Sequence, residues 1–465
     1  MSTVTFSGTF IDERRISEAI ERHSAPSKEA VAEALSRGRK LKGLSLEDAA
    51  VLVNARGEEA RKAIFETAES IKETIYGDRL VFFAPLYLSN YCVNDCGYCG
   101  FHAGNRSGRK KLTMDEIRSE VCRLIEMGHK RLLLEAGEDP ANNPIEYVLE
   151  AIDTIYSVKT PKGEIRRLNV NIAATTVENY RQLKEKGIGT YQLFQETYHR
   201  ETFDRLHRGP KADYTRQLYA MDKAFEAGID DVGLGVLFGL YDWRFEVLAL
   251  VSHAEYLSAA FGVGPHTISV PRFRPAPSVG FAPSYPVSDG DFLKLIAVLR
   301  IAVPYTGMII TTRESPEIRE TAFRIGISQT SAASTTTPGG FAIRENGGRG
   351  VEQFTLSDKR TLDEIAISVM KQGYTPSFCT ACYRKNRTGS VFMDLAKPGD
   401  IHEFCAPNSI LTLLEYLEDI ASPESRALGM EIIKKSLDGI ENPAIREATE
   451  EKIERIKKGE RDLYF

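Results

Sequence analysis

From about residue 80 to residue 330, short apolar runs alternate with longer stretches in which apolar residues recur at helical spacing. Short apolar runs bounded by turn residues are typical of buried strands, and the amphipathic stretches between them are typical of helices that cover a sheet. We predict helices at 115–127, 177–186, 214–227, 243–261 and 289–301, the first opened by a capping box from Thr113 to Glu116. We predict strands at 81–88, 131–134, 168–173, 191–194, 232–238, 268–272, 308–311 and 327–330.

This order of elements predicts a protein of the α/β class. Eight strands, most of them followed by a helix, are the elements of a parallel (β/α)₈ TIM barrel, which would occupy residues 80–340. An open, doubly wound sheet is the alternative arrangement of the same elements.

The chain on either side of the predicted barrel has a helical pattern. Helices after the N-caps Ser27 and Ser45 predict an N-terminal helical extension over residues 1–79. The stretch 334–350 is rich in Gly, Thr and Ser, so we expect a flexible boundary there. Two further helical patterns, at 408–420 and 423–437, predict a mainly helical C-terminal domain over residues 341–465.

Composition narrows the function classes. The net charge of −5 and the pI near 6.0 argue against nucleic acid or an anionic membrane as the main partner. The first fifteen residues contain no apolar signal-peptide core, and no stretch approaches the roughly 18 consecutive apolar residues of a membrane span. We therefore expect a soluble, cytoplasmic protein whose seven cysteines are reduced thiols and not disulfides.

Three of those cysteines, Cys92, Cys96 and Cys99, follow the first predicted strand. A cubane 4Fe-4S cluster normally takes four thiolates, so three thiolates leave one iron open to an exogenous ligand. S-adenosylmethionine (SAM) can fill that position through its amino and carboxylate groups. The spacing C-x3-C-x2-C, with the aromatic Tyr98 before the last cysteine, predicts a radical SAM enzyme. A zinc site with His102 as the fourth ligand is the alternative.

Residues at the ends of later strands point to the same ligand. Ala136-Gly137-Glu138 resembles the GGE motif of radical SAM enzymes, whose backbone meets the amino group of SAM. Glu196 follows the fourth predicted strand and is placed to meet the ribose or the amino group, and Arg216 is a candidate partner for the carboxylate of SAM. Glu138 and Glu196 could instead be ordinary solvated loop carboxylates.

A second triplet, Cys379, Cys382 and Cys405, lies beyond the predicted barrel. Three thiolates again suggest a cluster with an open iron. A structural zinc site with His402 as the fourth ligand is the alternative.

Four segments of the chain form a distinctive set: CVNDCGYCGF, FQETYHRETF, GPHTISVPRFRP, and FCTACYRKNRTG followed at a fixed distance by Cys405. Through these segments the chain resembles, over nearly its whole length, the HydG-type tyrosine lyases, which mature FeFe-hydrogenase and are related to the thiazole-type (ThiH) tyrosine lyase. The thiazole-type lyase shares the barrel features but lacks this tail, so the second triplet distinguishes the two.

The resemblance implies a specific reaction and set of cofactors. L-Tyrosine would be cleaved between Cα and Cβ to p-cresol and dehydroglycine, which yields carbon monoxide and cyanide for an iron–CO–cyanide–cysteine unit. The cofactors would be SAM and two 4Fe-4S clusters, the second with a fifth iron bridged by L-cysteine. In this family a histidine at the position of His266 ligates that iron. The partners would be other FeFe-hydrogenase maturation proteins and an electron donor such as ferredoxin or flavodoxin.

His266 precedes the sixth predicted strand, on the face opposite the first triplet. A strand of five or six residues spans roughly 17–20 Å, so the two iron sites should lie at least that far apart. The barrel interior would then be a passage for small products.

Arg313 ends the seventh predicted strand and is the candidate for holding the carboxylate of substrate tyrosine. A salt bridge to Glu314 or Glu317 is the alternative role for this arginine, and Arg272 and Arg274 are weaker candidates. Two other functions remain open: a different aromatic amino acid lyase with a repurposed tail, and an iron–sulfur carrier or scaffold without SAM chemistry.

Overall fold

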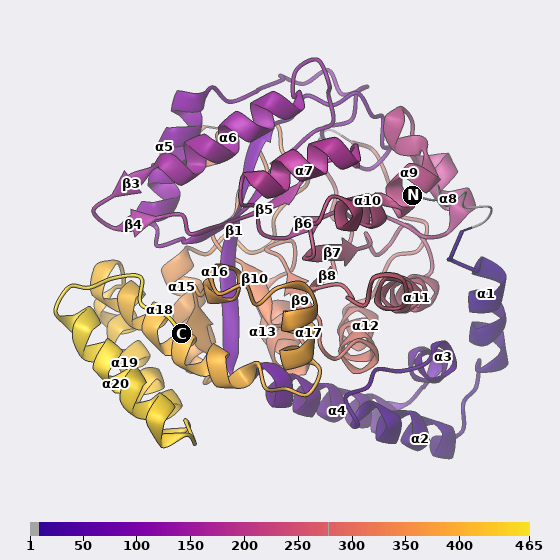
Figure 1. Ribbon diagram of the computed structural model, residues 1–465. Coiled ribbons are helices and arrows are strands. Elements are labelled where there is room, and N and C mark those ends of the chain that lie inside the picture. The colour runs from indigo at the N-terminus through magenta and orange to yellow at the C-terminus, as the bar shows by residue number, and fades with distance from the viewer. Residues whose placement is uncertain (1–8, 278, 349) are drawn as a thin grey trace.

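The computed structural model describes residues 9–277, 279–348 and 350–465, and its centre is a closed parallel barrel surrounded by helices (Figure 1). The barrel closes because β1 pairs with β2 along one edge and with β10 along the other, where Val81 lies opposite Gln329. The predicted (β/α)₈ barrel is therefore confirmed, and the open sheet is wrong. The eight strands are β1 (Arg79–Ser89), β2 (Arg131–Ala136), β5 (Arg167–Asn171), β6 (Tyr191–Gln192), β7 (Val232–Gly235), β8 (Thr267–Ser269), β9 (Gly307–Ile310) and β10 (Gln329–Ser331).

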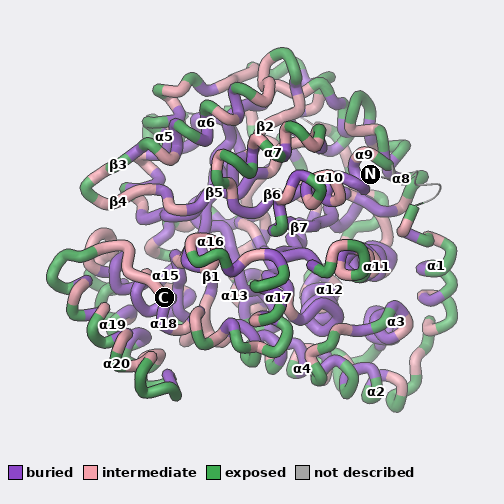
Figure 2. The backbone as a smooth tube through the Cα atoms, viewed as in Figure 1, coloured by how far each residue is buried: buried purple, intermediate pink, exposed green. Residues whose placement is uncertain are grey.

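Along each strand, successive side chains point alternately to the outside of the barrel and into its interior. On β2, Leu132 and Leu134 are buried in the main apolar core between strands and helices. The alternate residues Arg131, Leu133 and Glu135 line cavities inside the barrel. Figure 2 shows the strands in purple, buried beneath the surrounding helices.

The helices that surround the barrel follow the predicted ones closely. Thr113 and Glu116 form the predicted capping box of α5. The predicted helix at 214–227 is divided at Tyr219 into two short helices. No helix in the described part of the chain is long and apolar enough to cross a membrane. The surrounding helices are α5 (Met114–Glu126), α6 (Ile145–Ser157), α7 (Val177–Glu185), α8 (Arg200–Leu206), α9 (Tyr214–Leu218), α10 (Ala220–Glu226), α11 (Trp243–Phe261), α12 (Asp289–Ala302) and α13 (Pro316–Ile325). A small hairpin, β3 (Lys159–Thr160) and β4 (Gly163–Glu164), follows α6.

Four N-terminal helices lie outside this ring, along the lower right of Figure 1. They are α1 (Glu13–Arg22), α2 (Lys28–Gly38), α3 (Leu46–Asn54) and α4 (Glu58–Tyr76), and they pack mainly on α11, α12 and α13. Ser27 and Ser45 cap α2 and α3 by accepting from backbone N–H groups at 3.2 Å. Residues 1–8 of the expected extension lie outside the described residues.

The C-terminal region adds a ninth strand to the barrel, which the sequence pattern did not predict. Strand β11 runs parallel to β1, with Arg79 opposite Thr375 and Val81 opposite Ser377. Because the other edge of Val81 is occupied by β10, β11 lies on the β2 side of β1, before β2 begins opposite Ala84. The chain beyond β11 therefore starts at the N-terminal end of the barrel. The elements of this region are α14 (Gly340–Glu345), α15 (Leu362–Lys371), β11 (Thr375–Ser377), α16 (Ala381–Arg384), α17 (Gly389–Ala396), α18 (His402–Asp419), α19 (Pro423–Asp438) and α20 (Pro443–Lys457).

The first part of the stretch 334–350, which we expected to be a flexible boundary, is instead packed against the barrel, whereas residues 344–348 are exposed. Residues 334–341 are buried, and α14 forms inside the stretch. Its first N–H groups, from Phe341 and Ala342, donate to the carboxylate of Glu120 on α5 at 3.0 and 2.7 Å. Gly and Thr are used here for close packing and not for a flexible joint.

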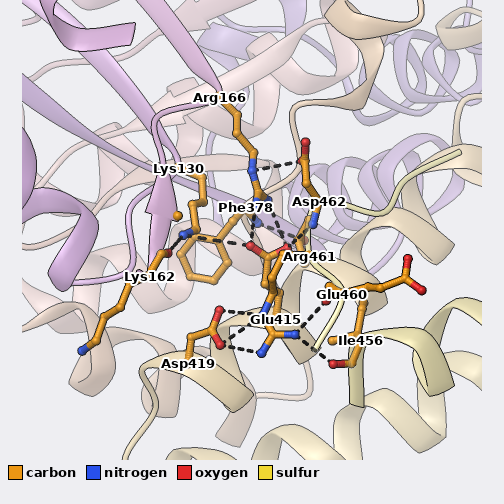
Figure 3. Close-up of polar contacts among 12 residues, drawn as sticks. Lys130, Lys162, Arg166, Phe378, Glu415, Asp419, Ile456, Glu460, Arg461 and Asp462 are labelled. Carbon is orange, nitrogen blue, oxygen red and sulfur yellow. Dashed lines mark hydrogen bonds and ion pairs between the residues drawn. The ribbon is translucent and has the colours of Figure 1, made fainter. Parts of the chain in front are cut away.

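Buried ion pairs fasten the C-terminal helices to the barrel (Figure 3). Arg166, just before β5, donates to both carboxylate oxygens of Glu415 on α18 at 2.5 and 3.1 Å, and its Nε lies 3.0 Å from Asp462. The side chains of Arg166 and Glu415 are only 6% and 5% exposed. Beside them, Arg461 binds Asp419 through two nitrogens. This network fixes the orientation of α18, which carries Cys405.

Candidate functional site

An upper cavity of about 180 Å³ opens at the C-terminal ends of the barrel strands. Cys92, Cys96 and Cys99 all line it. They lie in the loop after β1, whose backbone is fixed by hydrogen bonds from Asp95 N to Arg208 O and from Gly97 N to Leu206 O, both at 3.1 Å. The structure thus brings the first predicted triplet to one cavity wall.

The surroundings of these thiols fit a metal cluster better than free thiolates. Burial raises the pKa of Cys99 to about 11 and raises the pKa of Cys96 still further. A backbone N–H from Phe101 points at Sγ of Cys99 at 3.4 Å. Buried thiolates of this kind need a positive partner, which the irons of a 4Fe-4S cluster would supply. Three sulfurs on one wall would leave one iron facing the cavity.

The zinc alternative assigned His102 as the fourth ligand. In the structure, Nδ1 of His102 lies 2.6 Å from a carboxylate oxygen of Asp95. Among the residues that the structure describes, no three Cys, His, Asp or Glu side chains are arranged around a single metal position.

Gly137 and Glu138 lie directly beside this loop. We call the loop that carries Cys92, Cys96 and Cys99 the thiol loop. A Cβ at position 137 would come within 3.1 Å of Cβ of Cys92 and closer still to the carbonyl oxygen of Tyr91, so only glycine fits against this loop. Glu138 lines the cavity, and its carboxylate accepts from Arg216 and from Asn94, each at 2.6 Å. Arg216 and Glu138, predicted separately, are therefore partners. The contribution of Asn94 was not predicted.

Glu196 also lines the cavity, where it forms an ion pair with Lys211 at 2.6 Å. Its backbone φ of 68° lies in the left-handed region, which is unusual for a residue other than glycine and is often associated with functional sites. Sequence analysis missed Lys211, because nothing in the local segment HRGPKADY indicates which acid it meets. Tyr98 completes this side of the cavity, with its hydroxyl 2.8 Å from Nε2 of His207.

Arg313 faces the cavity from the end of β9, and its guanidinium stacks 3.2 Å above the ring of Phe354. The predicted alternative, a salt bridge to Glu314 or Glu317, is not formed among the described residues, and the carboxylate of Glu314 is bound by Arg272 and Arg274 instead. Burial lowers the pKa of Arg313. The guanidinium is thus inside the cavity and available to an anionic ligand.

Glu135 is a cavity residue that sequence analysis did not select. It is a single acid in the apolar strand RLLLEA, and its inward position two residues after Leu133 was the signal that could have identified it. Burial raises the pKa of its carboxyl to about 7. Such a group can hold or release a proton near neutral pH.

A lower cavity of about 50 Å³ lies at the N-terminal end of the barrel, and Cys379, Cys382, Cys405 and His266 all line it. Cys379 follows β11, and Cys405 lies on α18. A backbone N–H donates to Sγ of Cys379 at 3.4 Å, and burial raises the pKa of this thiol to about 12. Cys379 therefore has surroundings like those of Cys99. We call this space the tail cavity.

Two histidines were considered for the second triplet. Burial lowers the pKa of His266 to about 4, so its imidazole is neutral, as a metal ligand requires. His402, the ligand in the zinc alternative, packs instead against Gly77, where a Cβ would lie 2.6 Å from its Nε2. The residue set around the tail cavity fits an iron–sulfur cluster with an additional histidine-bound metal.

Only one layer of inward-facing side chains separates the two cavities. Phe83 and Leu133 line the upper cavity, whereas Val81 and Arg131, two residues earlier on the same strands, line the tail cavity. Successive inward residues of a strand are about 6.6 Å apart along it. The two triplets thus line cavities at opposite ends of one barrel.

Two family models match the chain. The Radical SAM superfamily model matches residues 86–250, and that of the Biotin and Thiamin Synthesis associated domain matches residues 269–375. Among curated proteins, 2-iminoacetate synthase of Salmonella typhimurium is 32% identical over 335 residues, which are 72% of this chain and 86% of that protein.

Two solved structures are similar over almost the full length. The crystal structure of HydG, a maturase of the FeFe-hydrogenase, is 52% identical with a TM-score of 0.95 and covers 98% of this chain and 100% of that one. The X-ray structure of the FeFe-hydrogenase maturase HydG from Carboxydothermus hydrogenoformans is 40% identical, with a TM-score of 0.83 and coverage of 95% and 97%.

Proposed function

This chain belongs to the radical SAM superfamily and, within it, to the family of the FeFe-hydrogenase maturase HydG, and we propose that it is a radical SAM L-tyrosine lyase. The lyase would form p-cresol and dehydroglycine, convert the latter to carbon monoxide and cyanide, and assemble an iron–CO–cyanide–cysteine unit for the hydrogenase active site. The observation that carries this proposal is the placement of two cysteine triplets in separate cavities at opposite ends of one barrel.

In this proposal, Cys92, Cys96 and Cys99 hold the SAM-binding cluster. When bound, the reduced cluster and SAM would supply a 5′-deoxyadenosyl radical for hydrogen abstraction from the substrate. The chain's own residues orient SAM: the backbone at Gly137 lies against the thiol loop, and two ion pairs stand nearby. These pairs are Glu138 with Arg216 and Glu196 with Lys211. Tyr98 borders the same space.

The substrate would lie in the same cavity. Arg313 would hold the carboxylate of L-tyrosine, because a guanidinium can bind a carboxylate through two hydrogen bonds. Glu135, with its pKa of about 7, would accept the phenol proton of the substrate at neutral pH. Side chains that enclose the cavity, such as Phe354, would keep water away from the reacting carbon atoms.

The tail cavity would hold the second cluster on Cys379, Cys382 and Cys405. His266 would be a ligand of the fifth iron, and L-cysteine would be a further component of this cofactor. Small diatomic products need to cross only the layer formed by Phe83, Leu133 and Ile309 to reach this cavity. Other FeFe-hydrogenase maturation proteins would accept the product, and ferredoxin or flavodoxin would supply electrons.

The similarity to 2-iminoacetate synthase supports a second candidate, a lyase that stops at dehydroglycine. A single anaerobic experiment separates these functions. Purified protein is given SAM, L-tyrosine and dithionite, and 5′-deoxyadenosine, p-cresol, carbon monoxide and cyanide are measured together with iron and sulfide. All four products with two clusters are expected. Cresol without carbon monoxide would indicate the second candidate, and no 5′-deoxyadenosine would indicate a carrier without SAM chemistry.

A further inference from the structure

A buried arginine on the inside of the barrel has no carboxylate partner. Arg131, the first residue of β2, lines the tail cavity and is 4% exposed. Within the described part of the chain its guanidinium forms a hydrogen bond to Gln329 but no ion pair. The carboxylate on this side of the barrel, Asp231, lies 3.7 Å from Nη2 of Arg167 and 3.4 Å from Nδ1 of His266. A buried charge without an opposite charge is costly, so Arg131 is suited to an anionic ligand.

The hydrogen bond to Gln329 leaves donors of both side chains free inside the barrel. Nη2 of Arg131 donates to Oε1 of Gln329 at 3.3 Å, so the amide turns its Nε2 toward Gly307, where a Cβ would lie 2.4 Å from it. Gly307 faces the barrel interior, as Ile309 does two residues later on β9. Nη1 of Arg131 and Nε2 of Gln329 donate to no described residue, and both remain accessible from the cavity, whereas Nε of Arg131 is enclosed and has no partner. A guanidinium and an amide N–H therefore lie side by side in the wall of the tail cavity.

A different arginine, Arg79, acts on the thiols of this cavity. Burial raises the pKa of Cys405, and the positive charge of Arg79 opposes that rise. Burial also raises the pKa of Cys379 to about 12, and Arg79 again opposes the rise. Burial lowers the pKa of His266 to about 4, and the charge of Arg131 contributes to that shift. Arg79 can therefore balance the thiolates, whereas the charge of Arg131 acts on the side of the cavity where His266 lies.

Arg131 also lies next to the layer that separates the two cavities. Leu133, which forms that layer with Phe83 and Ile309, is two residues further along β2. Successive inward residues of a strand are about 6.6 Å apart, so a small molecule that crosses the layer enters the tail cavity beside Arg131. The cysteine triplet and His266 line the same cavity. An anion bound to Arg131 would therefore lie between the layer and the second triplet.

We propose that Arg131 and Gln329 form an anion subsite of the tail cavity. A guanidinium can bind a carboxylate through two hydrogen bonds, and the amide N–H of Gln329 adds a further donor. The proposed function offers two anions for this position, the carboxylate of free L-cysteine and cyanide. The subsite itself follows from the side chains of this chain, whereas the identity of its anion rests on the proposed function.

The test is equilibrium dialysis of the full-length, cluster-loaded protein with three labelled probes, in the absence of SAM, tyrosine and reductant. The probes are L-cysteine, cysteamine, which lacks the carboxylate, and cyanide. If the anion is the carboxylate, the wild-type protein binds L-cysteine about tenfold more tightly than cysteamine, and Arg131→Met removes this difference. If the anion is cyanide, Arg131→Met lowers the cyanide affinity by about tenfold instead. Gln329→Glu should act like Arg131→Met, because its carboxylate would occupy the guanidinium.

Gln329→Glu gives Arg131 an internal counter-charge, so it keeps the test decisive if Arg131→Met fails to fold. Arg118→Met, at an exposed ion pair on α5, is the control and should leave all three affinities unchanged. Wild-type affinities for L-cysteine and cyanide in Gln329→Glu would overturn the subsite. Loss of tail iron from both variants would also overturn it, because Arg131 would then be only a counter-charge of the cluster. Iron and sulfide analysis of the wild-type protein tests the proposed function separately: a missing second cluster contradicts that function, whereas probe binding that still depends on Arg131 upholds the subsite.

Discussion

Arg216 donates from Nη2 to Oε1 of Glu138 at 2.6 Å, and Asn94 donates to the other oxygen of the same carboxylate at the same distance. Arg216 lies on α9, Glu138 follows β2, and Asn94 is part of the thiol loop. Three separate segments therefore fix one carboxylate in the wall of the cavity that Cys92 also lines. Because these hydrogen bonds already hold the carboxylate in position, a charged ligand can bind next to it with little rearrangement of the protein.

We predict that Glu138→Gln weakens SAM binding by about tenfold, since the amide keeps the shape but loses the charge that holds the guanidinium of Arg216 in place. Arg216→Lys should act in the same direction, because it removes the planar guanidinium that orients the acid. SAM affinity measured by equilibrium dialysis of the cluster-loaded protein checks both variants. Glu178→Gln, at an exposed ion pair on α7, is the control. Unchanged SAM affinity in Glu138→Gln would remove this acid from the binding site.

The local sequence was sufficient to predict the barrel strands, but not the contacts between residues in the barrel's cavities. Each barrel strand contains its own apolar residues, such as Leu132 and Leu134, so the apolar pattern predicts the strand. Strand β11 is only Thr375–Ser377 and contains Pro376, and it forms because β1 offers an unpaired edge. A proline is tolerated there because β11 is itself an edge strand. That strand places Cys379 at the bottom of the barrel, a position that no local pattern can give.

For the candidate site, too, local sequence predicts only part of what the structure shows. The cysteine spacings pointed to two triplets, and the structure places each triplet at one cavity. The partners of Glu196 and Glu138 come from other segments of the chain, and only the fold brings them together. The stretch 334–341 was misinterpreted for the related reason that Gly and Thr serve close packing as well as flexibility.

Substrate binding should depend on the planar shape of Arg313 as well as its charge. Arg313→Lys keeps the charge but loses two-point binding of a carboxylate and the stacking on Phe354. We expect the KM for tyrosine to rise by about tenfold or more, equivalent to roughly 1–3 kcal/mol. SAM affinity, measured on the same variant, should change little. A normal KM for tyrosine would exclude Arg313 from substrate binding.

The buried ion pair in Figure 3 predicts a stability effect that is separate from catalysis. Glu415→Ala leaves the guanidinium of Arg166 without its bidentate partner in a nearly water-free position. Removal of one partner of a buried pair typically costs about 3–5 kcal/mol. Because Asp462 still lies 3.0 Å from Nε of Arg166, we expect a cost at the lower end of that range. The exposed pair of Glu424 with Lys371 provides the control, and Glu424→Ala should cost less than about 1 kcal/mol. Thermal melts of the two variants should therefore differ clearly, and equal melting temperatures would contradict the prediction.

Glu246 on α11 gives the protein a pH-dependent stability. The residue is 1% exposed, and burial raises the pKa of its carboxyl to about 8. The carboxyl accepts hydrogen bonds from the hydroxyl of Thr197 and from Tyr198 N. The unfolded chain releases this proton near pH 4.5, so stability falls as the pH rises from there through about 8. Glu246→Gln stays neutral, and its melting temperature relative to wild type should increase between pH 5.5 and pH 8. Glu431→Gln, at an exposed position, is the control, and a difference independent of pH would contradict the assignment.

The two triplets should be separable by mutation, because their cavities lie at opposite ends of the barrel. Replacing Cys92, Cys96 and Cys99 with Ser should abolish 5′-deoxyadenosine and p-cresol, while iron bound at the tail persists. If this variant still cleaves SAM, the first triplet does not hold the SAM-binding cluster.

The converse variant, with Cys379 and Cys382 replaced by Ser, should continue to form p-cresol, because Arg313, Glu135 and the first triplet are untouched. Formation of the iron–CO–cyanide product should vanish, and free carbon monoxide should fall strongly. His266→Ala should reduce the same step less, since it removes a single ligand and leaves all three tail thiols. A structural zinc site predicts a different result: zinc in place of iron, a lower melting temperature, and cresol and carbon monoxide falling together. Measuring metals, cresol and carbon monoxide in one preparation decides between them, and a tail variant that makes the iron product at wild-type rates would exclude the proposed role of the tail cavity.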